Sequence, residues 1–539
     1  MGGKFVVNAD IVIVGAGSAG CVLANRLSAS PDLNVVLLEA GPRDLNPWIH
    51  IPVGYFKTIH NPSVDWCYKT EPDPGLNGRS IEWPRGRVLG GSSSLNGLLY
   101  VRGQSQDYDR WAQMGNTGWS WQDVLPLFKR AENNERGADE FHGTGGPLHV
   151  SNMRIERPIT NAWVEAAQAA GYKFNPDYNG AEQEGVGFFQ LTARNGRRCS
   201  SAVAYLGPAR GRRNLRIITN AQADRILFEG KRAVGIAYRN KSGDMHEIRA
   251  NKEIVLSGGS INSPQLLMVS GLGEADQLKD HGIEVLADLP GVGKNLQDHL
   301  QARLVYKCNE PTLNDEVSSL LGQAKIGWRY LTTRTGPMTM AASLATGFLK
   351  TRSDLETPDI QFHVQPLSAE NPGKGADPFS AFTMSVCQLR PESKGEIRLA
   401  SSDPRAYPKI IPNYLSAETD CQTAVAGVKI ARKIARHAPL TEKISEEFRP
   451  HADLPMEDDE ATLDWVRNNT ASIYHPTGTC KMGSDAMSVV DARLRVHGIQ
   501  GLRVADCSIM PEIVSGNTNA PAIMIGEKAS DLILEDLKA

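Results

Sequence analysis

The chain has 539 residues, more than a single hydrophobic core usually organises, so at least two folding units are expected. Apolar residues make up 41% and charged residues 22%, as in ordinary globular proteins, and the formal net charge is -3. This balance lacks the basic footprint of a nucleic-acid-binding protein. We therefore expect small-molecule ligands and no nucleic acid partner.

The first apolar segment, residues 10–14, is rich in β-branched residues and predicts a strand. It is far too short for the apolar core of a secretory signal or for a membrane span. We therefore expect a cytoplasmic protein without a transmembrane segment, which leaves peripheral membrane contact open. The eight cysteines form no CxxC pair and have no histidine at metal-ligand spacing. We expect neither a disulfide framework nor a bound metal.

A glycine turn, GAGSAG at 15–20, follows the first strand and leads into a segment with helical apolar spacing at 21–27. Strand, glycine turn and helix form the context of a dinucleotide-binding fingerprint. Gly15 would make the tight turn, Gly17 would let a pyrophosphate approach, and Gly20 would let helix and strand pack closely. The phosphates would lie at the helix N-terminus. A glycine turn of this kind also arises for purely structural reasons.

The next segment, residues 34–38, is almost continuously apolar, as expected for a parallel strand covered on both faces. It ends in Glu39, at the distance from Gly15 where an acidic residue binds ribose hydroxyls. The two strands and the turn together predict an adenine dinucleotide. They do not distinguish FAD from NAD.

Residues 85–97, RGRVLGGSSSLNG, are the densest glycine and serine stretch. Such composition is also typical of a flexible linker. Val88 and Leu89 interrupt the stretch and an apolar segment follows it, so we expect an ordered loop whose backbone donors face a ligand.

Further along the chain the spacing of apolar residues predicts more strands and helices. A capped helix start is expected at Ser263 and Pro264. The alternating segments 360–364 and 382–386 predict an antiparallel sheet within 305–460. The remaining expected elements are strands at 215–219, 233–238, 253–256 and 501–506, and helices at 423–435 and 521–537.

Five separated motifs resemble, in order, those of the glucose-methanol-choline (GMC) family of flavoprotein oxidoreductases. They are GAGSAG at 15–20, RGRVLGGSSSLNG at 85–97, GGSINSPQLLMVSGLG at 258–273, YHPTGTCKMG at 474–483 and GNTNAPAIMIGEKASDLI at 516–533. The resemblance implies an α/β fold with a discontinuous, Rossmann-like FAD-binding domain, placed at 1–155, 215–305 and 465–539. It implies a substrate-binding domain with a six-stranded antiparallel sheet, placed at 156–214 and 306–464.

The resemblance also implies FAD as the dinucleotide. One branch of the family links FAD covalently through a histidine of the glycine loop, and Leu95 stands at that position here, so a non-covalent flavin is expected. The residues that match cofactor-binding positions are Gly15, Gly17, Ser18, Ala19, Glu39, Ala40, Arg87, Gly91, Ser92, Asn96, Gly97, Leu98, Ala223, Tyr474, Ala505, Asp506, Asn519 and Ala520.

The resemblance places the catalytic base at His475 and a second active-site residue at Asn517. Hydride leaves an alcohol carbon more easily when a base takes the hydroxyl proton, and imidazole titrates in a suitable range. An amide can hold the oxygen without titrating. Asn519 competes for this amide role, but the spacing from Glu527 and Lys528 favours Asn517. His299 serves as an example of a histidine with a structural role.

The expected reaction is oxidation of a primary alcohol to an aldehyde, with hydride passed to FAD and electrons to dioxygen or a quinone-type acceptor. A helix that starts near Pro521 and points at the flavin would stabilise its anionic reduced form. Three alternatives stay open: an NAD-dependent dehydrogenase, a family member with non-oxidative, lyase-type chemistry, and a flavin-binding protein without chemistry.

Overall fold

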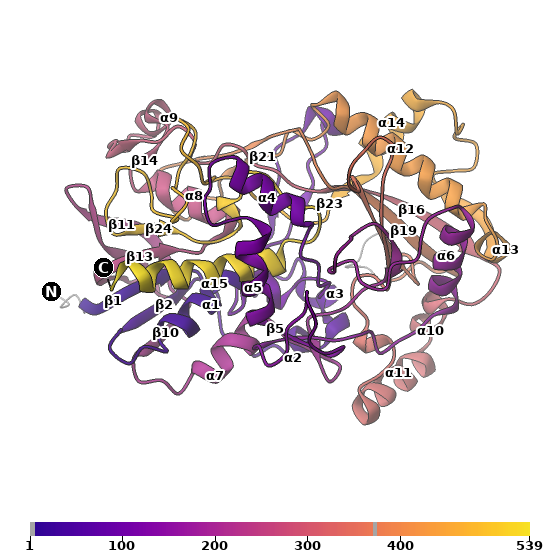
Figure 1. Ribbon diagram of the computed structural model, residues 1–539, viewed down its shortest axis with the longest axis horizontal. Coiled ribbons are helices and arrows are strands. Elements are labelled where there is room, and N and C mark those ends of the chain that lie inside the picture. The colour runs from indigo at the N-terminus through magenta and orange to yellow at the C-terminus, as the bar shows by residue number, and fades with distance from the viewer. Residues whose placement is uncertain (1–5, 370–374, 539) are drawn as a thin grey trace.

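The computed structural model describes residues 6–369 and 375–538 and contains two large sheets (Figure 1). The first sheet has the strand order β10-β2-β1-β13-β12-β11, with β24 paired to β13. Its parallel strands are β1 (Val6–Val14), β2 (Val35–Glu39), β10 (Leu215–Thr219), β13 (Met245–Leu256) and β24 (Leu502–Val504). The antiparallel strands β11 (Gln222–Glu229) and β12 (Arg232–Arg239) extend one edge.

The parallel strand β2 and the second half of β1, residues 11–14, are buried on both faces. Ile11, Val12 and Ile13 have no exposed surface, and every residue of β2 is buried. Continuous burial explains why these strands read as unbroken apolar runs rather than alternating ones. Helix α1 (Ser18–Leu27) packs against α15 (Asn519–Asp536), so the last helix of the chain lies beside the first (Figure 1).

The helix expected to start at Ser263 begins earlier, so this prediction is wrong. Helix α8 (Gly259–Val269) has Gly258 at its N-cap and contains Pro264. The Ser263 hydroxyl does not cap a start at its own position. It accepts a hydrogen bond from the Gly258 amide (3.0 Å) and donates one to Asp506 (2.6 Å), so it supports the preceding turn instead.

The second sheet confirms the predicted antiparallel sheet of the substrate domain, and six of its strands follow one another. Its strand order is β22-β16-β19-β18-β17-β7, and the short strand β23 (Thr470–Ser472) adds a seventh member beside β16. Helix α12 (Glu418–Ala435) packs on β19 and begins five residues before the predicted start at 423. The other strands are β7 (Gly185–Phe188), β16 (Leu300–Cys308), β17 (Ala345–Leu349), β18 (Ile360–Gln365), β19 (Ala381–Gln388) and β22 (Ile444–Arg449).

Shorter elements connect and cover the two sheets. The helices are α2 (Pro47–His50), α3 (Tyr55–Thr58), α4 (Ser105–Gln113), α5 (Trp121–Ala131), α6 (Pro158–Ala169), α7 (Gly207–Ala209), α9 (Ala275–Asp280), α10 (Leu313–Ser318), α11 (Leu320–Thr333), α13 (Leu440–Lys443) and α14 (Asp459–Asn469). The short strands are β3 (Tyr68–Lys69), β4 (Glu82–Trp83), β5 (Glu132–Asn134), β6 (Leu148–Val150), β8 (Ala193–Arg194), β9 (Arg197–Arg198), β14 (Leu272–Gly273), β15 (Ala287–Asp288), β20 (Glu396–Arg398) and β21 (Lys409–Ile411).

Within the described ranges, none of the helices combines the length and the apolar character that crossing a membrane requires. The cytoplasmic location and the domain boundaries stay predictions. Strand β23, although it falls in the range assigned to the FAD-binding domain, belongs to the antiparallel sheet.

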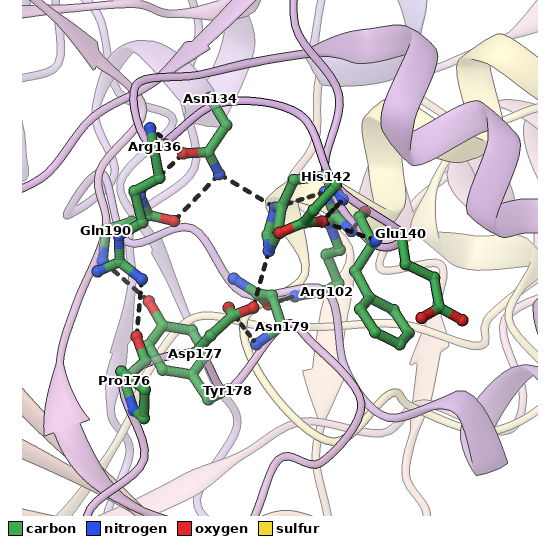
Figure 2. Close-up of polar contacts among 12 residues, drawn as sticks. Arg102, Asn134, Arg136, Glu140, His142, Pro176, Asp177, Tyr178, Asn179 and Gln190 are labelled. Atoms are coloured by element: carbon green, nitrogen blue, oxygen red, sulfur yellow. Dashed lines mark hydrogen bonds and ion pairs between the residues drawn. The ribbon is translucent and has the colours of Figure 1, made fainter.

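A buried polar cluster supports the chain just after the glycine loop (Figure 2). His142 lies between Glu132 (3.2 Å) and Asp177 (3.0 Å), and Arg102 forms an ion pair with Glu132 at 2.6 Å. The Asn179 side chain accepts from the Arg102 amide and donates to a neighbouring backbone carbonyl. Burial alone would lower the pKa of His142, but its two carboxylate partners raise that pKa to about 9.

Candidate active site

A cavity of about 580 Å³ extends from the nucleotide fingerprint to the antiparallel sheet. It is lined by most of the residues predicted from the sequence: Gly15, Gly17, Ser18, Ala19, Glu39, Ala40, Gly91, Ser92, Asn96, Gly97, Leu98, Ala223, Tyr474, His475, Asp506, Asn517 and Asn519. Three predicted residues are not among the lining residues. Arg87 stacks over the Trp66 ring at 4.9 Å, Ala505 is buried in the chain behind the wall, and Ala520 is buried in the first turn of α15.

The fingerprint glycines have the geometry that phosphate binding requires. Gly15 has φ +101°, and a Cβ there would lie 2.4 Å from the Ser257 carbonyl oxygen. A Cβ on Gly20 would lie 1.9 Å from the Gly15 carbonyl oxygen, whereas a Cβ on Gly17 would make only an ordinary contact, 3.8 Å from the Ser257 carbonyl oxygen. Helix α1 begins at Ser18 with no acidic residue in its first turn, so its free amides and dipole suit an anion.

Glu39 is buried, and its carboxylate forms hydrogen bonds with the backbone of two segments that border the cavity. Its carboxylate accepts the amides of Ala16 (2.9 Å) and Gly41 (2.8 Å). Burial raises the pKa of Glu39 to about 7, and the two amide bonds oppose that rise. The side chain therefore orders the glycine turn while its cavity-facing edge suits ribose hydroxyls.

The glycine loop packs directly against the fingerprint turn. The Gly90 amide donates to the Ala16 carbonyl at 2.8 Å. Gly91 has φ +52°, and a Cβ on it would lie 2.7 Å from the Cα of Gly17. Only glycine fits this contact, so residues 91–98 are an ordered wall of the cavity rather than a linker.

A tight turn presents His475 to the cavity. Tyr474 has φ +69°, a left-handed conformation that costs free energy for a residue with a side chain. Several hydrogen bonds hold the turn: Asp298 accepts the His475 amide (2.7 Å) and the Ser472 hydroxyl (2.5 Å), and Arg85 donates to the Tyr474 carbonyl (2.6 Å). Burial raises the pKa of Asp298 to about 6.

The hydrogen bonds of His299 define the proton positions on His475. His299 Nε2 lies 3.0 Å from the Leu389 carbonyl, which can only accept, so Nε2 carries a proton. Burial lowers the pKa of His299 to about 4, so the ring is neutral and its Nδ1 must accept. Its partner at 3.0 Å is Nδ1 of His475, which therefore donates. His475 Nε2 is therefore unprotonated, and its lone pair is an acceptor.

Asn517 lies beside that lone pair. Its Nδ2 is 3.2 Å from His475 Nε2, and its oxygen accepts from Gln361 at 3.3 Å, which fixes the orientation of the amide. The competing Asn519 is engaged elsewhere, because its oxygen accepts the hydroxyl of Ser18 at 2.8 Å. The structure thus brings His475 and Asn517 together and directs Asn519 toward the fingerprint turn.

Burial is the main reason that this histidine cluster is neutral. Burial, His299, His363 and Arg85 lower the pKa of His475 well below its usual value. Burial also lowers the pKa of His363, which lines the cavity, to about 3. The imidazole of His475 is therefore in its proton-accepting form across the physiological pH range.

Sequence reasoning missed several cavity residues that come from the antiparallel sheet. Gln301 and Arg303 alternate along β16 on the same face as His299, and His363 belongs to β18. The period of two in both strands carried this signal, but only sheet pairing reveals which face meets the cavity. His299, given above as an example of a structural histidine, contacts the expected base directly.

The model of the family described as GMC oxidoreductase matches residues 9–301 and 391–526. The chain belongs to the GMC oxidoreductase family. It is 44% identical over 530 residues to the alcohol dehydrogenase [acceptor] of Pseudomonas putida, covering 97% of this chain and 95% of that one. It is also 44% identical to the oxygen-dependent choline dehydrogenase of Brucella anthropi, covering 98% and 96%. The pyridoxine 4-oxidase structure from Mesorbium loti superposes with a TM-score of 0.88 at 32% identity, covering 97% and 99%.

Family membership decides two questions that the residues left open. FAD is the cofactor of this GMC oxidoreductase, so the alternative of an NAD-dependent dehydrogenase is wrong. The protein is an oxidoreductase that acts on CH–OH donors. The cavity fits FAD on its own evidence, because a helix N-terminus free of acidic residues, Glu39 and the glycine loop all face one continuous space.

Proposed function

We propose that this GMC oxidoreductase oxidises a primary alcohol to an aldehyde, with His475 as the base and Asn517 as the group that holds the alcohol oxygen. The observation that carries the proposal is the unprotonated Nε2 of His475 at the cavity wall, which accepts from the Asn517 amide nitrogen at 3.2 Å. A base and a hydrogen-bond donor that converge on one point suit an alcohol hydroxyl.

The roles of the residues follow from these contacts. FAD, when bound, supplies the acceptor for the hydride. His475 takes the hydroxyl proton at Nε2, and Nδ1 keeps its own proton because His299 accepts from it. Asn517 Nδ2 donates to the oxygen as negative charge develops there. The Asp298 carboxylate accepts the His475 amide and so holds the turn that carries the imidazole ring. The ring therefore needs little movement before the reaction.

The charge near the reacting end favours a neutral or anionic alcohol over a cationic one. Arg303 lines the cavity, and its guanidinium lies 3.1 and 3.2 Å from the Gln301 side chain, which accepts from it once the amide is turned. Across the described part of the chain, Arg303 forms no ion pair with a carboxylate. A quaternary ammonium group would meet this uncompensated positive charge. We propose an uncharged or anionic primary alcohol and not choline.

Two electron acceptors, dioxygen and a quinone-type compound, are proposed for the reduced flavin. One experiment tests the whole proposal. A panel of primary alcohols is mixed anaerobically with the holoenzyme, and flavin absorbance is followed, after which either dioxygen or a soluble quinone is added. We expect bleaching by uncharged alcohols, aldehyde as product and recovery of the oxidised spectrum. A flavin that no alcohol bleaches would overturn the proposal and would leave the lyase-type alternative to be tested.

A further inference from the structure

Helix α11 presents an unusual apolar surface to solvent. Four of its large apolar side chains are strongly exposed: Leu320 (85%), Leu321 (67%), Trp328 (70%) and Leu331 (69%). Soluble surfaces carry single exposed apolar residues, but contiguous patches of this kind mark interaction sites. The helix lies at the lower right edge of the molecule in Figure 1, away from the two sheets.

The exposed residues share one face of the helix. Leu321, Ala324, Trp328 and Leu331 follow one another at spacings of three and four residues, which places them in a single stripe. The opposite face is held by Tyr330, which is buried and donates its hydroxyl hydrogen bond to the Gly196 carbonyl at 3.2 Å. The buried Tyr330 side chain fixes the rotation of the helix about its axis, so the stripe faces solvent.

Positive charge flanks the stripe, and no carboxylate among the described residues pairs with it. Residues 317–353 contain no aspartate or glutamate, and the helix and its C-cap carry Lys325, Arg329 and Arg334. In the described ranges none of these three forms an ion pair with a carboxylate. Arg329 donates only to the Thr335 hydroxyl, and Arg334 lies over the Tyr330 ring.

A second cavity, of about 350 Å³, opens beside this helix and also combines apolar surface with positive charge. Its wall joins α11 to the segment around α2 and includes the apolar side chains of Ile51, Leu331 and Met338. Arg197 and Arg334 supply positive charge to the same wall. An anionic head group with an apolar chain matches this combination better than a purely polar or purely apolar ligand.

We propose that α11 is a membrane-surface helix whose partner is a bilayer that contains anionic phospholipid. An apolar stripe with a tryptophan and flanking basic residues is the pattern of helices that lie in the interface plane. At 14 residues the helix is about 21 Å long, shorter than the hydrocarbon core of about 30 Å, so it lies on the membrane rather than across it.

A second copy of the chain is a weaker candidate for the same surface. A two-fold contact through α11 would bring Lys325 and Arg329 of both copies together. No carboxylate of residues 317–353 could neutralise them. An anionic lipid surface supplies that neutralising charge. The inference concerns binding alone and does not depend on the proposed reaction.

The test is co-sedimentation of the flavin-loaded, full-length protein with vesicles. Phosphatidylcholine vesicles are compared with vesicles of equal parts phosphatidylcholine and phosphatidylglycerol, at low and high salt. We expect binding to the vesicles that contain phosphatidylglycerol, weakened by salt because the exposed charges are screened. Absence of binding to either vesicle would overturn the proposal.

Variants separate the apolar contribution to vesicle binding from the electrostatic one. Leu321→Ser, Trp328→Ser and Leu331→Ser combined should weaken vesicle binding by at least about tenfold, because their apolar surface no longer enters the interface. Lys325→Gln and Arg329→Gln should each cost about fivefold. Met245→Ser, an exposed apolar residue at the start of β13, serves as the matched control and should bind as the parent does.

Correct folding of each variant is checked by its bound flavin spectrum. If the triple variant binds vesicles as tightly as the parent, α11 is not the membrane site and the proposal fails. It fails as well if light scattering shows a parent dimer that the triple variant converts to monomer while vesicles bind neither protein. That result would assign the stripe to a second copy.

Discussion

The Nδ1 atoms of His299 and His475 lie 3.0 Å apart, and only one of them can carry a proton. The Leu389 carbonyl decides which, because it accepts from His299 Nε2 and so leaves His299 Nδ1 as the acceptor. If His475 is the base, as proposed, His299 is a positioning residue that keeps His475 Nε2 unprotonated.

Replacing His299 should slow flavin reduction without removing FAD. His299→Leu should cost between about 10-fold and the roughly 10⁴-fold that a wrong histidine tautomer costs in a serine protease. His299→Gln keeps a donor and an acceptor and should retain more activity. The measurement is anaerobic stopped-flow reduction as a function of pH. Equal rates for the Leu and Gln variants, with an unchanged pH profile, would reduce His299 to a packing role.

His475→Ala should slow flavin reduction by about 100-fold or more, the usual range for loss of a general base. Because burial lowers the pKa of His475, the parent rate should stay level as pH falls to 6.5 and decline only below that. The same stopped-flow assay measures both effects. A decline that begins above pH 7 would point to a different base.

Glu39→Ala should weaken FAD without altering the chemistry of the loaded enzyme. The substitution removes two charge-assisted hydrogen bonds to the fingerprint turn. Such bonds contribute roughly 1.5–3 kcal/mol each, so the Kd for FAD should rise by at least about tenfold. Titration of apoprotein with FAD provides the readout, and His475→Ala is the control that should leave Kd unchanged.

Arg303 should discriminate between choline and its uncharged analogue 3,3-dimethylbutan-1-ol, which has nearly the same shape. The analogue should reduce the flavin faster in the parent, and Arg303→Gln should raise the relative rate with choline by at least about tenfold, because like charges no longer meet. Arg216→Gln, on β10 outside the cavity lining, is the control. A parent that prefers choline would refute the proposed substrate class.

The stability of the protein should depend on His142 in a pH window set by its partners. Its pKa rises from 6.5 to about 9 in the folded state, so its contribution is complete below pH 6.5 and disappears as pH rises through 9. The unfolding free energy of the parent should therefore exceed that of His142→Gln by on the order of 3 kcal/mol at pH 6 and by little at pH 10. The difference in Tm between the two proteins, measured at both pH values, reports this change. His437→Gln, on an exposed histidine, should show no such trend.

The parallel half of the fold was predictable because its signals are local. Gly15 is required by its φ of +101° and Gly20 by its contact with the Gly15 carbonyl, and the segment 35–38 is apolar throughout because both its faces are covered. Strand β11 gave no such signal, since its polar and apolar residues do not follow a clear period and Arg225 is exposed at its centre.

The contact between His299 and His475 could not be derived from the sequence. It exists because β23 pairs with β16 in a register that sets Ser472 opposite Leu300. Pairing between segments so far apart in the chain depends on the whole antiparallel sheet, and a shift of one residue would turn His299 to the other face. The motif around His475 predicted the base, and the sheet shows which residue contacts it.

The docking of α15 on α1 has a consequence for how the holoenzyme is made. Asn519 and Ala522, near the C-terminus, share the wall of one cavity with Gly15 and Gly17, near the N-terminus. A nascent chain still missing its last helix has no closed chamber for the flavin. We therefore expect FAD binding to require α15, and a chain truncated before Asn519 should be isolated colourless.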